Sequence, residues 1–495
     1  MFSQTMNNVH HRGTRKLRGP KFPNHRLTPH RAVCGCLLWL MGVAAGAQNP
    51  IISTAFTPDP APFALGDTLY LFADHDEDDA QYFAMRDWQL YSTCDMLNWT
   101  YRGTPLTLAT FAWARQDDNA WASQAVERDG KWYWYVAAED TARHLHGIGV
   151  AVADHPDGPY TDPIGRPLVP GDWGFIDPCV FIDDDGEAYL FWGNNGLWYA
   201  QLGADMTSLA SPIMRVETED STAFGPLVMK HDYQLGRPTL KTNFEEAPWV
   251  YRRGDTYYLE YAAGGVPEHW AYATASSVHG PWHYAGRIMD EARGSFTIHG
   301  GTVEFAGRLF LFYHTGTGIN GSGFRRSTCV EEYTLAPDGS IPHINATNEG
   351  VRTGVGTLSP FLRVEAETMA EGYGLKTDRT AGREHYLRRI HNGAWLRLRN
   401  VDFAEGAASV IARVLPMAGG IIEMLVDGKS IARIDVPTGR QGGVSSAEQG
   451  EWMEVEAAVG DVCGVHDLTI LFRGGDDELM AFDWWQMVLR EGNDL

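Results

Sequence analysis

The chain has 495 residues, of which 44% are hydrophobic, 12% aromatic and 21% charged. This mixture excludes intrinsic disorder, collagen, a coiled coil and a small disulfide scaffold. Its 40 basic and 63 acidic residues leave a net charge of −23, which argues against a nucleic-acid or anionic-membrane partner because phosphate binding needs surplus positive charge. A neutral or cationic partner is favoured.

Residues 1–47 have the composition of an export signal. Seven basic residues and no acidic residue lie between Met1 and Arg31, and an apolar run of sixteen residues follows, at 32–47. That run is shorter than the roughly 20 residues of a membrane-spanning helix, and it ends on the small residues that precede signal cleavage. We expect cleavage after Ala47 and a secreted or periplasmic mature chain; a membrane anchor is the alternative, and Met6 is a second possible start. The mature chain would keep 33 basic and 63 acidic residues, a net charge of −30.

Five segments then repeat one pattern, a short apolar run, a glycine turn and an aromatic-rich run. Glycine supplies the positive φ of a tight turn, and aromatic residues suit a half-buried sheet, so each segment predicts a β-hairpin. The spacing of the turn glycines, 53 to 68 residues, predicts a five-bladed β-propeller with four strands in each blade over residues 50–340. The turn glycines are Gly66, Gly130, Gly186, Gly254 and Gly307.

A polar position precedes each predicted hairpin by a few residues. If the hairpins are blades, these positions begin the innermost strands and converge on the central axis, where three carboxylates and one imidazole would face one pocket. The alternative is that they are solvated turn residues. The positions are Asp59, Ser123 with Gln124, Asp177, Glu246 and His299.

Three converging carboxylates suit the hydrolysis of a neutral sugar polymer. One carboxylic acid protonates the departing oxygen, and a second carboxylate activates water or attacks the sugar. A third, beside the acid, can keep the pKa of that acid high by like-charge repulsion. The sequence therefore predicts a glycosidase; the alternative from a different class is a lectin-like propeller that binds sugar without cleaving it.

The residues at these positions resemble glycoside hydrolase family 43, whose members are five-bladed propellers that act on arabinose- and xylose-containing plant polysaccharides. The resemblance covers residues 49–343, in motifs such as Thr57-Pro-Asp-Pro60, Phe175-Ile-Asp-Pro178 and Glu246-Ala-Pro-Trp249. It implies an exo-acting enzyme that inverts the anomeric configuration, needs no organic cofactor and releases α-L-arabinofuranose or β-D-xylose from plant cell-wall polysaccharide.

Carried over residue by residue, the resemblance assigns three catalytic carboxylates. Asp59 is expected to be the general base, Asp177 the residue that raises the pKa of the acid and orients it, and Glu246 the general acid. Glu245 is the neighbouring carboxylate, which strand alternation would point to the opposite face.

The same resemblance suggests four substrate-binding residues. His299 is expected near the axis below the sugar, and Arg326 is expected to contact the catalytic carboxylates; a core histidine and a surface arginine are the alternatives. Trp121 and Phe175 are candidate sugar-stacking platforms, although most of the 17 tryptophans must lie in the core.

An acidic segment, Ala73-Asp-His-Asp-Glu-Asp-Asp-Ala80, follows the first hairpin. It lacks the glycine and the terminal glutamate of an EF-hand loop, so we interpret it as a solvated run of charges rather than a cation site.

Residues 361–495 are expected to form a separate β-sandwich, after a propeller domain at 48–344 and a linker at 345–360. Alternating segments such as 409–414 and 421–426 predict its antiparallel strands. This part resembles carbohydrate-binding module family 6, a jelly-roll sandwich. The resemblance implies a structural Ca²⁺ at Glu365, Glu367 and Asp483, an acidic sheet edge being the alternative.

The module departs from that family where sugar is usually held between two aromatic side chains. Arg389 and Gln449 occupy these places. We therefore expect the principal sugar cleft to be altered or lost. For the whole protein we expect a monomer that acts on a plant polysaccharide or oligosaccharide, with no nucleic-acid partner and no membrane attachment after signal removal.

Overall fold

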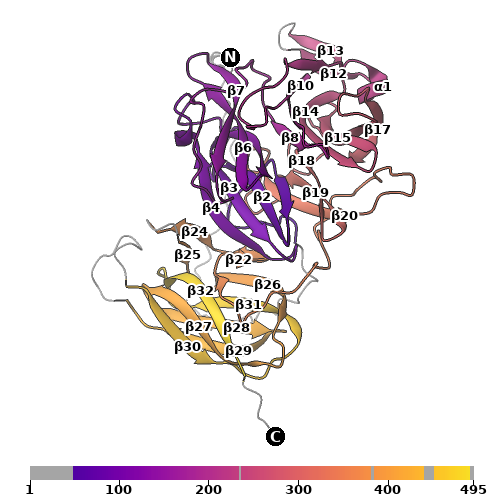
Figure 1. Ribbon diagram of the computed structural model, residues 1–495. Coiled ribbons are helices and arrows are strands. Elements are labelled where there is room, and N and C mark those ends of the chain that lie inside the picture. The colour runs from indigo at the N-terminus through magenta and orange to yellow at the C-terminus, as the bar shows by residue number, and fades with distance from the viewer. Residues whose placement is uncertain (1–47, 233–235, 381–383, 440–450, 491–495) are drawn as a thin grey trace, which may run out of the picture. The chain divides into compact units, whose positions relative to one another are not determined.

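The computed structural model describes residues 48–232, 236–380, 384–439 and 451–490 (Figure 1). The predicted signal segment 1–47 and Gln449 therefore lie outside the described residues. Within the described ranges, no helix combines the length and apolar character needed to cross a membrane.

The first part of the described chain forms a five-bladed β-propeller, as predicted, and each blade is an antiparallel sheet (Figure 1). The first blade contains β1 (Ala61–Leu65), β2 (Thr68–Asp76), β3 (Met85–Thr93) and β4 (Trp99–Thr107). The second contains β5 (Trp121–Arg128), β6 (Lys131–Asp140) and β7 (Leu145–Ala153). The third contains β8 (Cys179–Ile182), β9 (Ala188–Trp192), β10 (Leu197–Gln201) and β11 (Met214–Val216). The last two blades are β14 (Phe244–Arg253), β15 (Thr256–Ala263), β16 (His269–Ala275) and β17 (His283–Met289); and β18 (Gly300–Phe305), β19 (Arg308–Thr315) and β20 (Ser327–Tyr333).

The five predicted hairpins are confirmed. They pair β1 with β2, β5 with β6, β8 with β9, β14 with β15 and β18 with β19. Each predicted turn glycine has a positive φ, from 56° at Gly254 to 84° at Gly186, which is the region that favours glycine over residues with a side chain.

The prediction of four strands in every blade is wrong for two blades. The blade of β5–β7 has three strands, and isolated bridges such as Val152 to Thr161 join its outer edge to the segment that follows. In the blade of β18–β20, the N-terminal segment lies against β20, where Ile51 N donates to Thr328 O at 2.9 Å. This contact joins the first blade to the last and closes the ring.

Two elements are inserted between the third and fourth blades. They are the short helix α1 (Ser221–Phe224) and the hairpin of β12 (Val228–Asp232) with β13 (Arg237–Lys241). This hairpin matters for the site described below because it carries Lys230.

Aromatic side chains fill the spaces between blades. Trp132 on β6 contacts the rings of Phe63, Tyr70 and Phe72 of the first blade, at centroid distances of 5.3, 5.2 and 5.7 Å. Fully burying a side chain such as Phe72 stabilises the fold by about 1.5 to 3 kcal/mol. The blades are therefore held rigidly enough to fix the residues at their inner ends.

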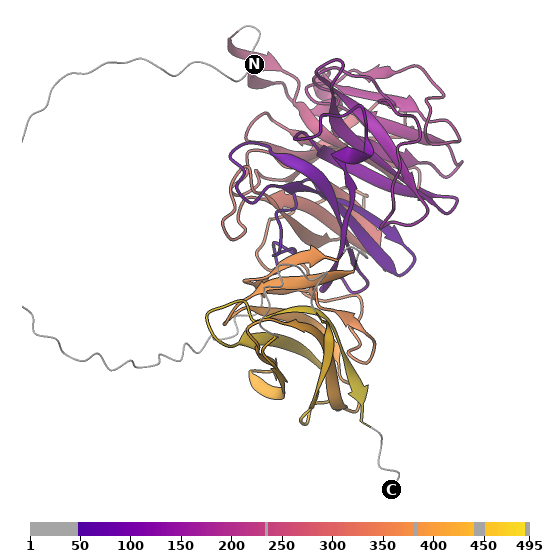
Figure 2. The ribbon, with the colours of Figure 1, turned by 90° about the vertical axis from the view of Figure 1, so that its left-hand side faces the viewer.

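The C-terminal part is a β-sandwich, as predicted, with its strands in two sheets (Figure 2). One sheet contains β21 (Val364–Glu365), β24 (Lys376–Arg379), β25 (His385–Ile390), β27 (Ala407–Pro416), β30 (Met453–Ala458) and β32 (Met480–Leu489). The other contains β23 (Glu371–Tyr373), β26 (Trp395–Asp402), β28 (Gly420–Val426), β29 (Lys429–Val436) and β31 (Val465–Arg473).

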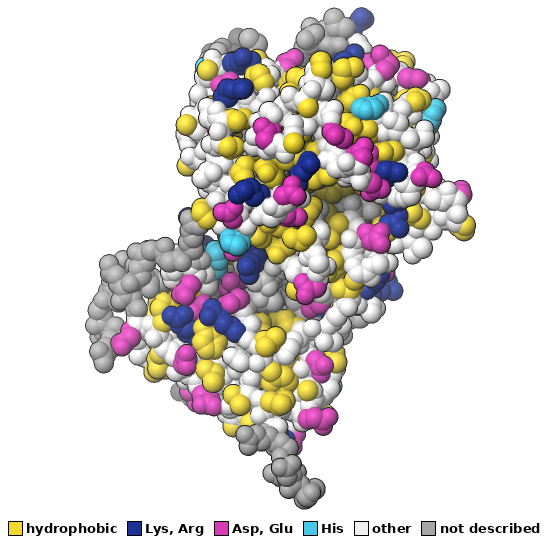
Figure 3. All heavy atoms as spheres, viewed as in Figure 1, with side chains coloured by type: hydrophobic (Ala, Val, Ile, Leu, Met, Phe, Trp, Pro, Cys, Tyr) yellow, Lys and Arg dark blue, Asp and Glu magenta, His cyan; other side chains and the backbone are white. Residues whose placement is uncertain are grey.

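Direct contacts join the sandwich to the first blade. The short strand β22 (Thr368–Met369) pairs with β4, and Asn98 Nδ2 donates to Arg399 O at 2.8 Å. On the face shown in Figure 3, acidic and basic side chains are interspersed.

Candidate active site

The polar positions singled out in the sequence lie at the start of the innermost blade strands. Asp59 and Asp177 each come two residues before a strand, β1 and β8, and His299 comes directly before β18. Glu246 lies inside β14, at an irregularity in its pairing with β15. Their charges influence one another, since Glu246 and Asp59 both raise the pKa of Asp177. The structure thus brings the four groups together.

The backbone is strained at three residues in or next to these polar positions. Asp59, Asp177 and Ala247 have φ angles of 51°, 59° and 57°, in the left-handed region that residues with a side chain seldom adopt. Such conformations each cost roughly 1 to 3 kcal/mol and cluster at functional sites. Here they turn the chain where each acidic motif enters its blade.

Close packing explains the two glycines that follow His299. A Cβ on Gly300 would lie 1.9 Å from Phe312 O, and one on Gly301 would lie 2.1 Å from the Trp249 ring. Only glycine allows the backbone of β18 to approach these groups, and this approach brings His299 to the axis.

Asp59 is buried among cationic and imidazole groups. Its Oδ1 lies 3.3 Å from Arg326 Nη1, 3.2 Å from His314 Nδ1 and 3.7 Å from His299 Nδ1. Burial by itself would raise the pKa of Asp59, but Arg326 and the two histidines outweigh it and lower that pKa below its ordinary value. Asp59 is therefore ionised throughout the neutral and mildly acidic range.

Arg326 is itself held by a second carboxylate. Its Nε and Nη2 lie 3.0 and 2.9 Å from the two oxygens of Asp76, and its backbone N–H donates to Asp76 Oδ2 at 2.8 Å. The guanidinium also lies 5.0 Å from the centroid of the Phe83 ring. Arg326 contacts one of the three predicted catalytic carboxylates, Asp59, and it is a buried residue and not a surface one.

This arrangement corrects the interpretation of the acidic segment 73–80. Asp74 and Asp76 are not solvated charges; both lie on β2 with no exposed surface. Both side chains lie near Arg326, since Asp76 binds it directly and its charge acts on Asp74, although the pairing of β2 with β3 is irregular between the two residues. The sequence analysis did not single out Asp74 or Asp76. Their spacing of two positions along a predicted strand was a signal that could have found them.

The pKa of Glu246 is shifted in the opposite direction to that of Asp59. Burial, then the neighbouring charge of Glu245, raises its pKa to about 7, and a hydrogen bond of 2.5 Å from Asn194 Nδ2 to Glu246 Oε2 partly opposes the rise. Glu246 is thus protonated below neutral pH and can donate a proton, whereas Asp59 can accept one.

Glu245 is not remote from this acid. It is buried and paired with Lys230, whose Nζ lies 2.5 Å from Glu245 Oε2 and also donates to Phe244 O at 2.8 Å. Simple alternation along β14 predicts that Glu245 faces away, but the pairing with β15 is irregular on both sides of Glu246. Among the neighbouring charges, that of Glu245 raises the pKa of Glu246 most. The sequence analysis had expected Glu245 to face away from the site.

Asp177 is bonded to the segment that carries the acid. Its Oδ2 accepts a hydrogen bond of 2.9 Å from Ala247 N, directly after Glu246. Burial, and then the charges of Glu246 and Asp59, raise the pKa of Asp177 well above its ordinary value. A further buried carboxyl, Glu268, accepts from Ile298 N at 2.9 Å and has a raised pKa because of burial and the charge of Glu246.

The remaining predicted substrate residues differ in their surroundings. Burial lowers the pKa of His299 to about 4, so this imidazole is neutral at pH 7. Trp121 is half-buried and stacks on His146, with ring centroids 4.3 Å apart. Phe175 is also half-buried, and its ring packs against Trp192 and Trp198, so much of it serves the core.

The predicted calcium ligands lie in the C-terminal module. Glu367 and Asp483 are buried, and Glu367 Oε2 and Asp483 Oδ1 have no hydrogen-bond donor among the described residues. The Glu365 side chain is ion-paired with Arg363 at 2.9 Å. In the described ranges, no three His, Cys, Asp or Glu side chains form a ready metal cluster. Asp483 is also engaged by cations, since its Oδ2 accepts from Arg413 Nη1 at 2.8 Å and its Oδ1 lies 3.9 Å from Arg363 Nη2. The unsatisfied oxygen of Glu367 is therefore the group of this set that a cation fits best.

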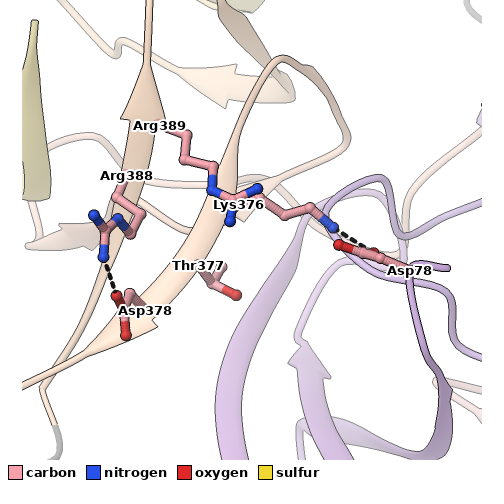
Figure 4. Close-up of a pocket in the computed structure, with 6 residues that line it drawn as sticks. All are labelled: Asp78, Lys376, Thr377, Asp378, Arg388 and Arg389. Atoms are coloured by element: carbon pink, nitrogen blue, oxygen red, sulfur yellow. Dashed lines mark hydrogen bonds and ion pairs between the residues drawn. The ribbon is translucent and has the colours of Figure 1, made fainter. Parts of the chain in front are cut away.

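Arg389 lies beside a small cavity of about 360 Å³ (Figure 4). Asp78 of the propeller forms an ion pair of 2.7 Å with Lys376 there, and Arg388 pairs with Asp378 at 2.7 Å. Arg389 is exposed and has a φ of 55°. The cavity is lined by five charged residues and Thr377, and none of its lining residues is aromatic. The expectation of an altered sugar cleft stays a prediction.

Glycoside hydrolysis uses one carboxyl group as an acid and another as a base, and the raised pKa of Glu246 and the lowered pKa of Asp59 suit these two tasks. Fold and site together define a β-propeller glycosidase with a C-terminal carbohydrate-binding module. Residues 47–341 match glycosyl hydrolases family 43, and residues 365–488 match carbohydrate binding module family 6. The chain belongs to glycosyl hydrolases family 43.

Relatives agree with this assignment. The chain is 30% identical over 505 residues to an arabinoxylan arabinofuranohydrolase of Bacillus subtilis (strain 168), covering 90% of this chain and 93% of that protein. It is 32% identical to xylosidase/arabinosidase 43A of Humicola insolens, over 59% of this chain and 98% of the relative. A crystal structure of a Bacillus subtilis family 43 arabinoxylan arabinofuranohydrolase with cellotetraose has a TM-score of 0.73 and 28% identity, covering 90% of this chain and 98% of that one.

Proposed function

We propose that this protein is an exported, inverting exo-glycosidase that releases α-L-arabinofuranose from arabinoxylan. The proposal rests on two buried carboxyl groups at one site whose surroundings shift their pKa values in opposite directions. Asp59 is held ionised by Arg326 and His314, while burial and Glu245 keep Glu246 protonated up to about pH 7.

In the proposed reaction, Asp59 removes a proton from water as the water attacks the anomeric carbon. The bond from that carbon to the departing oxygen breaks, and Glu246 gives its proton to this oxygen. Arg326 keeps Asp59 in the anionic form that accepts the proton. Asp177 orients the strand segment of Glu246 through Ala247 N. The reaction yields two neutral sugars and needs no organic cofactor.

The choice of arabinofuranose rests on the relatives that span both domains. The two arabinoxylan arabinofuranohydrolases cover 90% of this chain, whereas the xylosidase/arabinosidase of Humicola insolens covers only 59%. Release of β-D-xylose is the second candidate activity, supported by that relative and by a β-xylosidase relative with 29% identity.

A substrate panel tests the proposal. The purified chain is incubated with nitrophenyl α-L-arabinofuranoside, nitrophenyl β-D-xyloside and arabinoxylan, and the released sugars are identified. We expect arabinose to be the main product from the polymer. Proton NMR of the first product formed reports its anomeric configuration; retention would contradict the inverting mechanism. Polysaccharide binding without release of any sugar would favour the lectin-like alternative.

The same proposal covers location, assembly and metal. We propose export because of the basic and apolar composition of residues 1–47, and N-terminal sequencing of the exported protein would locate the cleavage site. We further propose a monomer, tested by sedimentation. Finally, we propose a structural Ca²⁺ held by Glu367 and Asp483 near Glu365, supported by the unsatisfied oxygens of the first two.

A further inference from the structure

Asp74 is a buried carboxyl that the proposed reaction does not use. It lies on β2 and has no exposed surface. Its Oδ1 accepts a hydrogen bond of 3.4 Å from Ser123 Oγ, and that hydroxyl in turn accepts from Trp134 Nε1 at 3.0 Å. Its Oδ2 is also buried, and no N–H or hydroxyl group in the described part of the chain donates to it. An ionised carboxylate in such a place would be left with an unsatisfied charge.

The position of Asp74 is tied to the catalytic base. Asp74 N donates to Pro58 O at 3.2 Å, so β2 is bonded to the residue directly before Asp59. After burial, the charge of Asp59 is the main influence that raises the pKa of Asp74, so the two carboxyl groups lie close to each other. Two carboxyl groups can share a hydrogen bond only when one of them carries a proton.

The surroundings place that proton on Asp74. Asp59 faces the cation of Arg326 at 3.3 Å and His314 at 3.2 Å, and these groups favour its anionic form. Asp74 faces the hydroxyl of Ser123 and, at longer range, Asp76 and Arg326; Arg326 is already bound by both oxygens of Asp76. Burial, then the charge of Asp59, raises the pKa of Asp74 well above its ordinary value.

We propose that Asp74 is a positioning residue, a neutral carboxylic acid that donates a hydrogen bond to Asp59 and fixes the orientation of the catalytic base. The inference rests on the proposed function of Asp59. Ser123 donates to Oδ1 of Asp74, which leaves Oδ2, the buried oxygen without a donor, to carry the proton. The base is then restrained by Arg326 on one side and by Asp74 on another, which reduces the reorganisation needed when it takes a proton from water.

Asp74→Asn and Asp74→Ala separate this role from simple packing. The amide of asparagine can still donate to Asp59 and accept from Ser123, whereas alanine can do neither. We expect Asp74→Ala to lower kcat about 100-fold with little change in KM, and to shift the acidic limb of the pH profile upward, because Asp59 loses a hydrogen bond to its charged form. We expect the kcat of Asp74→Asn to be at least about tenfold higher than that of Asp74→Ala. An asparagine variant as impaired as the alanine variant, at equal thermal stability, would overturn the proposal.

Two further measurements distinguish failure of the proposed role of Asp74 from failure of the proposed function. Asp59→Ala is assayed in parallel; if it retains full activity, Asp59 is not the base and the proposed function fails. Infrared difference spectra of the wild-type protein and Asp74→Asn at pH 6 report protonation without any substrate. We expect the variant to lose one protonated-carboxyl band; loss of an ionised-carboxylate band instead would show Asp74 to be charged and overturn the inference even in an inactive protein.

Discussion

The backbone N–H of Ala247 donates a 2.9 Å hydrogen bond to Asp177 Oδ2, and this bond ties one active-site carboxyl to the residue directly after another, Glu246. Ala247 has a φ of 57°, a conformation that costs free energy and persists only because such contacts hold it. The orientation of Glu246, the proposed general acid, thus depends on a bond between the third and fourth blades.

Replacing Asp177 tests this dependence. Asparagine can still accept from Ala247 N, while alanine cannot, so Asp177→Ala should lose roughly ten times more kcat than Asp177→Asn. Steady-state kinetics on arabinoxylan measure the difference. Equal losses in both variants would mean that the charge of Asp177, and not its hydrogen bond, matters.

Glu246→Gln should abolish cleavage of poor leaving groups. A general acid contributes about 10² to 10⁴ in rate, and this contribution is largest when the departing oxygen is a poor leaving group. We expect kcat on arabinoxylan to fall by about that factor and kcat on a nitrophenyl glycoside to fall much less. Equal loss on the two substrates would argue against Glu246 as the acid.

The pH profile of the wild-type enzyme should be limited on its basic side by Glu246. Because the acid must be protonated, kcat/KM should decline as the pH rises through about 7, the pKa of Glu246. Because the pKa of Asp59 is lowered, the base should stay ionised, and no acidic limb from Asp59 should appear at mildly acidic pH.

Glu245 and Asn194 should move this basic limb in opposite directions. Glu245→Gln removes the charge that raises the pKa of Glu246, so the limb should shift to lower pH; Asn194→Ala removes a hydrogen bond to the ionised form, so it should shift to higher pH. Glu405→Gln, at an exposed position of the module, is the control and should leave the limb in place. Shifts of the same sign in the first two variants would contradict these roles.

Arg326→Met should weaken both the fold and the base. Removing one partner of a buried ion pair typically costs about 3 to 5 kcal/mol, and here Asp76 would lose its bidentate partner. Urea unfolding measures that loss. In the folded fraction, the pKa of Asp59 should rise, and an acidic limb should appear in kcat/KM. An unchanged free energy of unfolding would show that Asp76 finds another partner.

Calcium should stabilise the C-terminal module. A ligand at 100 times its Kd stabilises the folded state by about 2.7 kcal/mol, and we expect calorimetry of the full chain to show a transition that calcium raises and EGTA lowers. The Asp483→Asn variant should lose this response. A calcium-independent transition in the wild-type protein would mean that Glu367 and Asp483 form an acidic sheet edge without metal.

The sequence by itself determined the repeated hairpins and the polar positions that precede them. Both are local properties: a glycine with positive φ makes each tight turn, and apolar alternation makes each strand, whatever lies elsewhere in the chain. Five hairpins at similar spacing then require the residues before them, Asp59, Asp177, Glu246 and His299, to share one end of a closed ring.

Only the tertiary structure decided the protonation states and the groups that set them. Arg326 binds Asp76 from 250 positions away in the chain, and Lys230 reaches Glu245 from an inserted hairpin. An acidic run that looked solvated supplies two fully buried carboxyls, Asp74 and Asp76. The pKa of a carboxyl depends on burial and on charges a few ångströms away, and those distances exist only once the blades have closed around the axis.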